Sequence, residues 1–190
     1  MPRFSLLASA ALATVLLASV PASAQTMNEK TVTVGGAPMY PSKNIVQNAI
    51  NSKDHTTLVA AVKAAGLVDT LQGAGPFTVF APTNAAFAKL PAGTVDNLVK
   101  PENKDTLTKI LTYHVVPGRL TAVALMKAIK DGEGTAKFKT VAGGDLWIKQ
   151  AGPGKLSVTD AKGDVAMVTI PDVLQSNGVI HVIDTVLLPM

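Results

Sequence analysis

The sequence comprises 190 residues, 47% of them hydrophobic and 16% charged, which indicates a single globular domain rather than a disordered chain or a coiled coil. It contains no cysteine, and this excludes disulfides, thiolate metal sites and a catalytic cysteine. The 17 Lys and Arg residues exceed the 13 Asp and Glu residues by a net charge of +4, and the charges are interspersed along the chain. Only 4% of the residues are aromatic, so we expect no nucleic-acid partner.

Residues 1–24 have the pattern of a cleavable signal peptide. Arg3 precedes an uncharged apolar run from Phe4 to Val20, Pro21 ends that run, and Ala22-Ser23-Ala24 offers small residues to a signal peptidase. A retained membrane anchor is the alternative, but such an anchor needs about 20 apolar residues. We therefore expect cleavage after Ala24, a secreted or periplasmic location, and no membrane insertion of the mature protein.

The N-terminal half of the mature chain is predicted to be helical. Residues 25–40 are polar and contain Gly and Pro, which favours a loose N-terminal arm with an extended piece at Thr31–Val34. Apolar residues then recur with helical spacing as far as residue 129, interrupted by a short strand at Phe77–Phe80. The clearest helix follows Pro101 and places four residues on a single face: Leu107, Ile110, Leu111 and His114.

From Thr135 onward the pattern changes to short β runs between Gly-rich turns. The predicted strands are 136–141, 146–149, 156–159 and 165–170. The last run, Gly178–Leu188, is almost continuously apolar, which is typical of a strand buried on both sides. Helices and strands in separate blocks indicate an α+β fold, with a helical half packed on a predominantly antiparallel β core.

The three histidines are the first candidates for chemistry. His55, His114 and His181 lie far apart, and none has a partner at metal-ligand spacing, so we predict no metal site. His55 falls in a polar segment beside a helix start and is expected to be solvated. The other two fall on apolar surfaces, where a histidine is usually neutral and hydrogen-bonded. A hydrolase site around His114 or His181 stays open as an alternative, which burial of both imidazoles would remove.

The remaining polar patterns are weak. The chain has no nucleophile elbow, no phosphate-binding loop and no dinucleotide fingerprint, so we expect neither catalysis nor a cofactor. Asp160 and Asp164 flank Gly163, and a turn explains them better than a pair of catalytic carboxylates. A polysaccharide-binding function is a further alternative, based on the basic residues Lys137, Lys139 and Lys149.

Three segments together resemble a fasciclin domain. They are GPFTVFAPTNAAFAKL (Gly75–Leu90), LTYHVVPGRL (Leu111–Leu120) and NGVIHVIDTVLLP (Asn177–Pro189), and they occur in the family's order and at suitable spacing. The resemblance extends over about Tyr40–Pro189. We assign residues 41–189 to a fasciclin domain, which implies the fasciclin-like α+β fold.

The signature residues have structural interpretations. Thr83 or Asn84 would cap a helix, and Asn84 and His114 would form buried hydrogen bonds. Asn177 and Gly178 would form a tight turn into the last strand. In that strand His181 would be buried, and Asp184 would need backbone N–H groups or a hydroxyl as partners. Many relatives carry an acidic residue where this chain has Ala85. The favourable interaction of an acidic side chain with the helix N-terminus is therefore absent here.

The resemblance implies adhesion as the function. Fasciclin domains occur in secreted or surface proteins that bind proteins, matrix or cell surfaces. Two elements implicated in animal relatives have counterparts here, Tyr113 and His114 in the central segment and Asp172 with Val173 before the last strand. Equally, Asp172 could cap a turn and Val173 could pack inward. The single domain with a signal peptide resembles the secreted bacterial branch, and its partner would be a protein or glycan on a cell surface or matrix.

Overall fold

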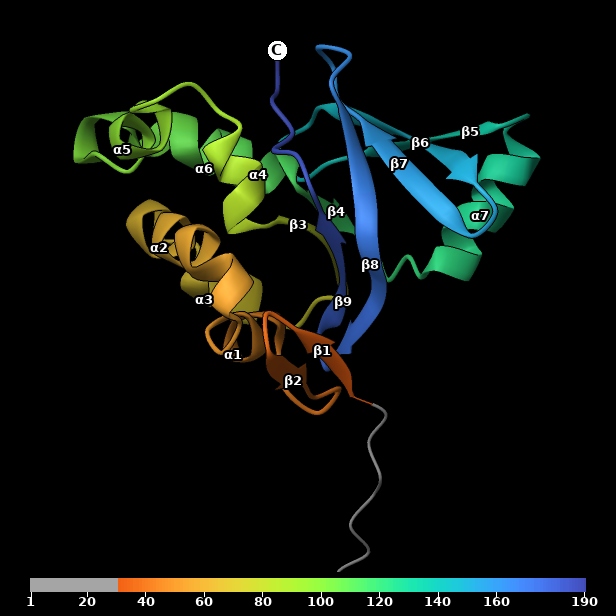
Figure 1. Cartoon of the computed structure of the whole chain (residues 1–190), viewed down its shortest axis with the longest axis horizontal. Coiled ribbons are helices and arrows are strands. Elements are labelled where there is room, and N and C mark those ends of the chain that lie inside the picture. The colour runs from red at the N-terminus through yellow and green to blue at the C-terminus, as the bar shows by residue number, and fades with distance from the viewer. Residues whose placement is uncertain (1–30) are drawn as a thin grey trace, which may run out of the picture.

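The computed structural model describes residues 31–190 (Figure 1). The predicted signal peptide, residues 1–24, lies outside the described residues. The helices are α1 (Ile45–Ala49), α2 (Thr56–Ala65), α3 (Val68–Gln72), α4 (Asn84–Ala88), α5 (Thr94–Leu98), α6 (Lys104–Tyr113) and α7 (Ala122–Asp131), with 3-10 turns at Lys53–His55 and Pro101–Asn103.

The main sheet has seven strands. In spatial order they are β4 (Val115–Pro117), β3 (Phe77–Pro82), β9 (Gly178–Ile183), β8 (Val165–Gln175), β7 (Lys155–Thr159), β6 (Asp145–Gly152) and β5 (Thr135–Lys139). Only β3 and β9 pair in parallel, with Phe77 opposite Gly178, and the other neighbours are antiparallel. Helices α1–α6 lie on one side of the central strands, and α7 lies on the other side, beside β5–β7 (Figure 1). The predicted α+β fold with a predominantly antiparallel core is confirmed.

Two apolar cores flank the central strands. Val79 and Phe80 are successive residues of β3, so they point to opposite faces of the sheet. Val79 belongs to the core beneath helices α1, α2 and α6, and Phe80 belongs to the core that α7 shares with β5–β8. Strand β9 alternates in the same way, with Val182 in the first core and Ile183 in the second. All residues of β9 are buried, which confirms the strand predicted from its continuous apolar run.

The predicted extended piece at Thr31–Val34 is confirmed as a strand, but the expectation of a loose arm is wrong for residues 32–39. Strand β1 (Val32–Val34) and strand β2 (Ala37–Met39) form a hairpin, and the side chains of Val34 and Met39 are buried in the first core. Gly35 and Gly36 make the connection with φ of 59° and 76°, the left-handed conformation that a two-residue hairpin turn requires. Each strand of this hairpin has only three residues, so its apolar alternation was too short to distinguish it from a coil.

Other boundaries also differ from the sequence prediction. Residues 115–117 form the edge strand β4, which the prediction missed because Pro117 and Gly118 gave a stop signal directly after the helix. Strand β8 continues past residue 170 as far as Gln175, with irregular pairing between Val168 and Val173. The pair Asp172 and Val173 therefore lies within a bulged strand and not on a surface connection. Strand β9 ends at Ile183 instead of Leu188.

Candidate interaction site and the framework that supports it

Two adjacent side chains cap two different helices. The Thr83 hydroxyl accepts a hydrogen bond from the Ala86 N–H at 3.2 Å and so caps α4 as predicted. The Asn84 side chain instead accepts from the Thr57 N–H at 3.0 Å and donates to the Lys53 carbonyl at 2.8 Å. Asn84 therefore caps α2 and holds that helix against the start of α4.

His114 follows the last residue of α6, and only 3% of it is exposed. Its Nδ1 donates to the Ile110 carbonyl at 2.8 Å, and its Nε2 accepts from the Leu187 N–H at 2.9 Å, which fixes the tautomer. Burial lowers the pKa of His114 to about 4, although the Ile110 hydrogen bond and the charge of Asp160 oppose the shift. The imidazole is therefore neutral at pH 7, as predicted, and it joins α6 to the C-terminal segment.

Tyr113 is completely buried beside it. Its hydroxyl donates to the Asp145 carbonyl at 2.6 Å and accepts from the Ala161 N–H at 3.0 Å. Burial raises the pKa of the phenol, so it remains protonated. The side chain thus joins α6 to β6 and to the turn after β7.

His181 and Asp172 form a second network, between β9, β8 and the start of α7. The His181 Nε2 donates to the Leu120 carbonyl at 2.7 Å, and its Nδ1 accepts from the Asp172 N–H at 3.3 Å. The Asp172 carboxylate accepts from the Ala122 N–H at 2.6 Å, so it satisfies the first residue of α7. Burial lowers the pKa of His181, which keeps the ring neutral. Asp172 has a φ of 54°, an uncommon conformation that Asp tolerates better than most residues.

The turn between β8 and β9 consists of Ser176 and Asn177, and Gly178, which the sequence prediction placed in the turn, is the first residue of β9. The Asn177 carbonyl oxygen of the side chain accepts from the Ile45 N–H at 3.1 Å, and its amide donates to the Leu71 carbonyl at 2.8 Å. A Cβ atom on Gly178 would lie 2.0 Å from the Phe77 carbonyl oxygen. Only glycine therefore allows β3 and β9 to approach at this point.

Asp184 finds both kinds of partner that the sequence predicted. Its Oδ1 accepts from the Met167 N–H at 2.8 Å and from the Thr185 hydroxyl at 3.0 Å, and Lys89 lies 3.6 Å from Oδ2. Burial alone would raise the pKa of this carboxyl, but these hydrogen bonds and Lys89 hold the pKa below its ordinary value.

The predicted partner-contacting residues are mostly inaccessible. The exposed fractions of Tyr113, His114 and Val173 are 0%, 3% and 1%, so in this structure their side chains offer no surface to a partner. Packing and hydrogen bonding explain why these residue types occur at the three positions. The sequence pattern alone does not distinguish these roles from contact with a partner. Of the four candidates, only Asp172 is partly exposed, and its carboxylate is bound to the first turn of α7.

The expectation of a solvated His55 is wrong. Only 3% of the residue is exposed, and its Nδ1 lies 2.9 Å from the Ser52 hydroxyl. The residue follows a polar stretch, but the 3-10 turn that contains it folds the ring under α2 and into the first core. Burial lowers the pKa of His55, and the Ala81 backbone and the charge of Asp54 partly oppose this shift.

The β5–β6 hairpin carries a cationic outer face. Lys137, Lys139 and Lys149 are exposed, and the strand register places all three on the same side as Trp147. The Lys137 ammonium lies 5.7 Å from the centre of the Trp147 ring and 3.0 Å from the Asp145 carboxylate. The structure thus brings together the three lysines named from the sequence.

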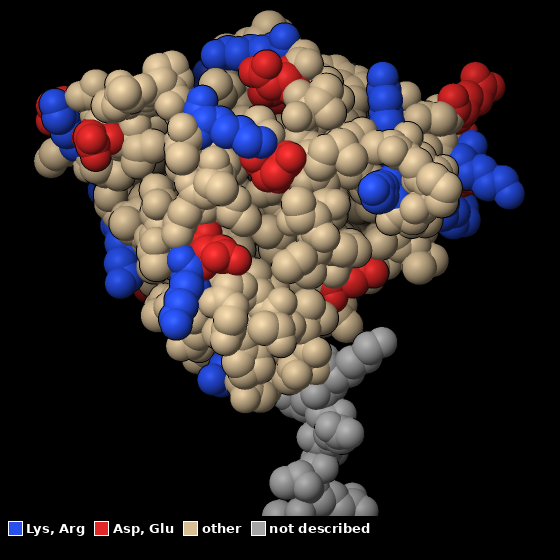
Figure 2. Space-filling model, viewed as in Figure 1, with Lys and Arg blue, Asp and Glu red and all other residues tan. Residues whose placement is uncertain are grey.

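Elsewhere the surface charge is mixed. On the face in Figure 2, cationic and anionic side chains alternate between broad uncharged areas. Among residues 31–190, no three His, Asp or Glu side chains lie close enough together to hold a metal ion. No helix in this part of the chain combines the length and apolar character needed to cross a membrane.

Comparison with known proteins agrees with the fold. The family model described as "Fasciclin domain" matches residues 53–189. The chain belongs to the fasciclin domain family. This fasciclin domain also resembles a FAS1 domain pair from the insect cell adhesion molecule Fasciclin I, with a TM-score of 0.68 and 22% identity over 78% of this chain and 52% of that one.

Relatives of the fasciclin domain occur in bacteria. Protein sll1483 of Synechocystis is 50% identical over 85% of this chain and 82% of its own length. The immunogenic protein MPB70 of Mycobacterium bovis is 35% identical over 89% of this chain and 74% of its own length. The cell surface glycolipoprotein MPB83 of the same species is 38% identical over 74% of this chain and 58% of its own length.

Two buried polar pairs escaped the sequence interpretation. The Asn48 amide donates to the side-chain oxygen of Gln175 inside the fold, and both residues are at most 1% exposed. The other pair is Ser52 with His55. The spacing of Ser52 three residues before His55 was a usable signal, because a hydroxyl before a helix often bonds within its own turn. Nothing local in the sequence relates Asn48 to Gln175.

Proposed function

We propose that this fasciclin domain is an exported, non-catalytic module that binds a protein or glycan of a cell surface or matrix. The observation that carries the proposal is the role of the polar signature residues, because their side chains are used to hold the domain together. His114 and His181 have both ring nitrogens engaged and are almost completely buried. The basis for a hydrolase site around either ring is therefore lost.

Family membership supports the same conclusion. A relative with 38% identity is named as a cell surface glycolipoprotein. The pattern of residues 1–24 favours export, and the described residues contain no helix able to span a membrane. An exported domain that has no group of metal-binding side chains among residues 31–190, and whose His114 and His181 are buried and hydrogen-bonded, acts through its surface.

We place the contact surface where β8 meets α7, and we call it the β8–α7 surface. It comprises the exposed residues that surround the Asp172–Ala122 hydrogen bond: Arg119, Val123, Pro171 and Leu174. Val123 is 76% exposed and Leu174 is 39% exposed, while Arg119 donates to the carbonyls of Gln175 and Ser176 at the end of β8. Apolar residues on a rigid, hydrogen-bonded base are suited to protein contact.

Adhesion of matched variants tests this surface. The double change Val123→Ser with Leu174→Ser should reduce retention of the labelled protein on cell-envelope material several-fold, with little change in Tm. The control is Val141→Ser with Val165→Ser, which alters two other exposed valines, 47% and 53% exposed. If the Val123→Ser, Leu174→Ser variant is retained as well as the original protein, the β8–α7 surface is not the contact. If retention falls equally in this variant and in the control, the adhesion is non-specific and hydrophobic.

Binding of an acidic polysaccharide is the second candidate function. The aligned Lys137, Lys139 and Lys149 beside Trp147 favour it, because cations next to an aromatic face suit a carboxylated sugar chain. Changing all three lysines to Gln should abolish salt-sensitive retention on alginate. The control changes the exposed Lys53, Lys100 and Lys130 to Gln. If both triple variants elute together, the net charge and not this face causes retention.

A further inference from the structure

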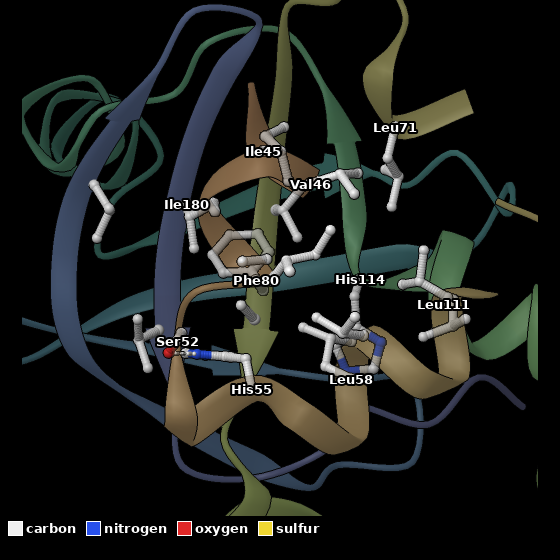
Figure 3. Close-up of a pocket in the computed structure, with 18 of the residues that line it drawn as sticks. Ile45, Val46, Ser52, His55, Leu58, Leu71, Phe80, Leu111, His114 and Ile180 are labelled. Atoms are coloured by element: carbon white, nitrogen blue, oxygen red, sulfur yellow. Dashed lines mark hydrogen bonds between the residues drawn. The ribbon is translucent and has the colours of Figure 1, made fainter. Parts of the chain in front are cut away.

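A cavity lies in the first core, between the helices and the central strands (Figure 3). Its volume is about 80 Å³. Helices α1 and α2 contribute Val46, Leu58 and Val62, strand β9 contributes Ile180, and the N-terminal hairpin contributes Val34 and Met39. The walls are mainly aliphatic, and the other side chains in the lining are Ser52, His55, Lys63, Phe80 and His114.

One polar group in these walls has no partner. The His55 Nδ1 is bonded to the Ser52 hydroxyl (Figure 3). Its Nε2 is buried and has no partner with normal hydrogen-bond geometry among the described residues, although the Ala81 backbone acts on the ring and raises its pKa. The other two histidines differ, since both nitrogens of His114 and of His181 are satisfied. Buried unpaired side-chain nitrogens are rare in folded proteins, and one that lines a cavity points to a ligand.

The cavity has an opening. Its lining includes Ile50, which is 52% exposed, and the exposed Lys63, so it reaches the surface between the end of α1 and the outer side of α2. An exposed isoleucine at this opening provides an apolar entrance. Exposed residues at the mouth and buried residues within describe a site that a molecule enters from solvent.

We propose that this cavity binds a small apolar molecule carrying one hydroxyl group, such as a phenol or a short monohydric alcohol, with the hydroxyl on His55 Nε2. A hydroxyl both donates and accepts, so it pairs with Nε2 in either tautomer that the Ser52 contact allows. The site is separate from the β8–α7 surface and does not depend on the proposed adhesion.

The volume limits the size of the ligand. A cavity of about 150 Å³ holds benzene, and one water needs about 10–15 Å³. The cavity of about 80 Å³ has about half that volume, so it encloses roughly three non-hydrogen atoms, and the rest of a phenol ring would lie in the opening beside Ile50. A longer apolar chain would extend past Ile50 into the opening.

Titration with phenol and toluene tests the proposal. The two molecules have the same number of non-hydrogen atoms, and only phenol carries the hydroxyl. The purified protein should bind phenol about tenfold more tightly than toluene, since the hydrogen bond to a buried group adds to a shared apolar contact. Phenol should also shift the ¹⁵N resonance of His55 Nε2 in the NMR spectrum, whereas toluene should not.

Variants separate the contribution of the hydrogen bond to His55 from that of the apolar lining. His55→Leu should equalise the affinities for phenol and toluene, and Ala49→Leu, at the lining, should weaken both. Ala64→Leu places the same side chain on the exposed side of α2 and should change neither affinity. No saturable binding of either molecule, or equal affinities in the unaltered protein, would overturn the proposal. An unshifted His55 resonance would do so even if His55→Leu fails to fold.

Discussion

Replacing His114 with Phe should reduce the stability of the domain at pH 7 and also flatten its dependence on acid. Phe keeps a ring of similar size in the same space but cannot accept the hydrogen bond from the Leu187 N–H, which lies in a residue with no exposed surface. A buried donor left without a partner costs about 1–3 kcal/mol of the free energy of unfolding. Replacement by Ala would add a cavity and bring the loss nearer to 3–5 kcal/mol.

The effect of pH follows from the lowered pKa of His114. In the unfolded chain the imidazole has its ordinary value of 6.5, and in the fold the value is about 4. Between these values the unfolded state binds the proton and the folded state does not, so stability falls as the pH falls. The full contribution is present above pH 6.5, and about 3 kcal/mol of it is lost by pH 4. His55 and His181, whose pKa values are also lowered, act in the same direction.

Urea denaturation of the two proteins from pH 7 to pH 4 checks both effects. The original protein should lose stability more steeply than His114→Phe, by up to about 1.4 kcal/mol per pH unit, which is the contribution of one proton. The two curves should therefore approach each other near pH 4. Leu111→Ala is the control, because it removes a neighbouring buried apolar side chain and should lower stability without changing the slope. Parallel curves for the protein and His114→Phe would refute the account of a buried neutral imidazole.

The other predictions concern the framework. Asp172→Ala should lower the free energy of unfolding by about 1 kcal/mol, since the Ala122 N–H loses its acceptor. In the same urea titration Asp172→Asn should keep most of the stability that Asp172→Ala loses. Equal losses of stability in the two variants would contradict the role of Asp172 as the acceptor for the Ala122 N–H. Asn84→Ala should lower stability by about 1–2 kcal/mol and speed amide exchange at Thr57, whereas Ala85→Ser, at the exposed next position, should do neither. Gly178→Ala should prevent folding because its Cβ would lie 2.0 Å from a backbone oxygen, and a normal circular dichroism spectrum would show that the strands can separate there.

The partner-contacting residues were the part of the sequence prediction that the structure supports least. Tyr113, His114 and Val173 were candidates because the resemblance implies that their positions are implicated in binding in animal relatives. Burial of all three explains the same residue types by packing. A sequence pattern indicates positions where the residue type matters. Hydrogen bonds inside a fold and contacts with a partner can require the same residue types, so the pattern does not separate the two.

Local features followed from the sequence alone. Thr83 caps α4 because its hydroxyl and the N–H that it accepts lie within one turn of the chain. Strand β9 is buried on both sides because every position in it is apolar or able to hide its polar group. Asp184 has a backbone N–H and a hydroxyl as partners because a carboxylate within an apolar segment must be satisfied.

Only the tertiary structure decided which distant groups meet. Asn84 caps a helix that begins 28 residues before it, and His114 accepts from an N–H 73 residues later. Val34 and Met39 are buried because the hairpin packs against the first core. His55 is buried with one nitrogen unpaired because α2 covers it. Sequence patterns carry periodicity and turn chemistry over a few residues. The pairing of polar atoms and the shape of a cavity arise from the simultaneous packing of all the elements, and no segment contains that information by itself.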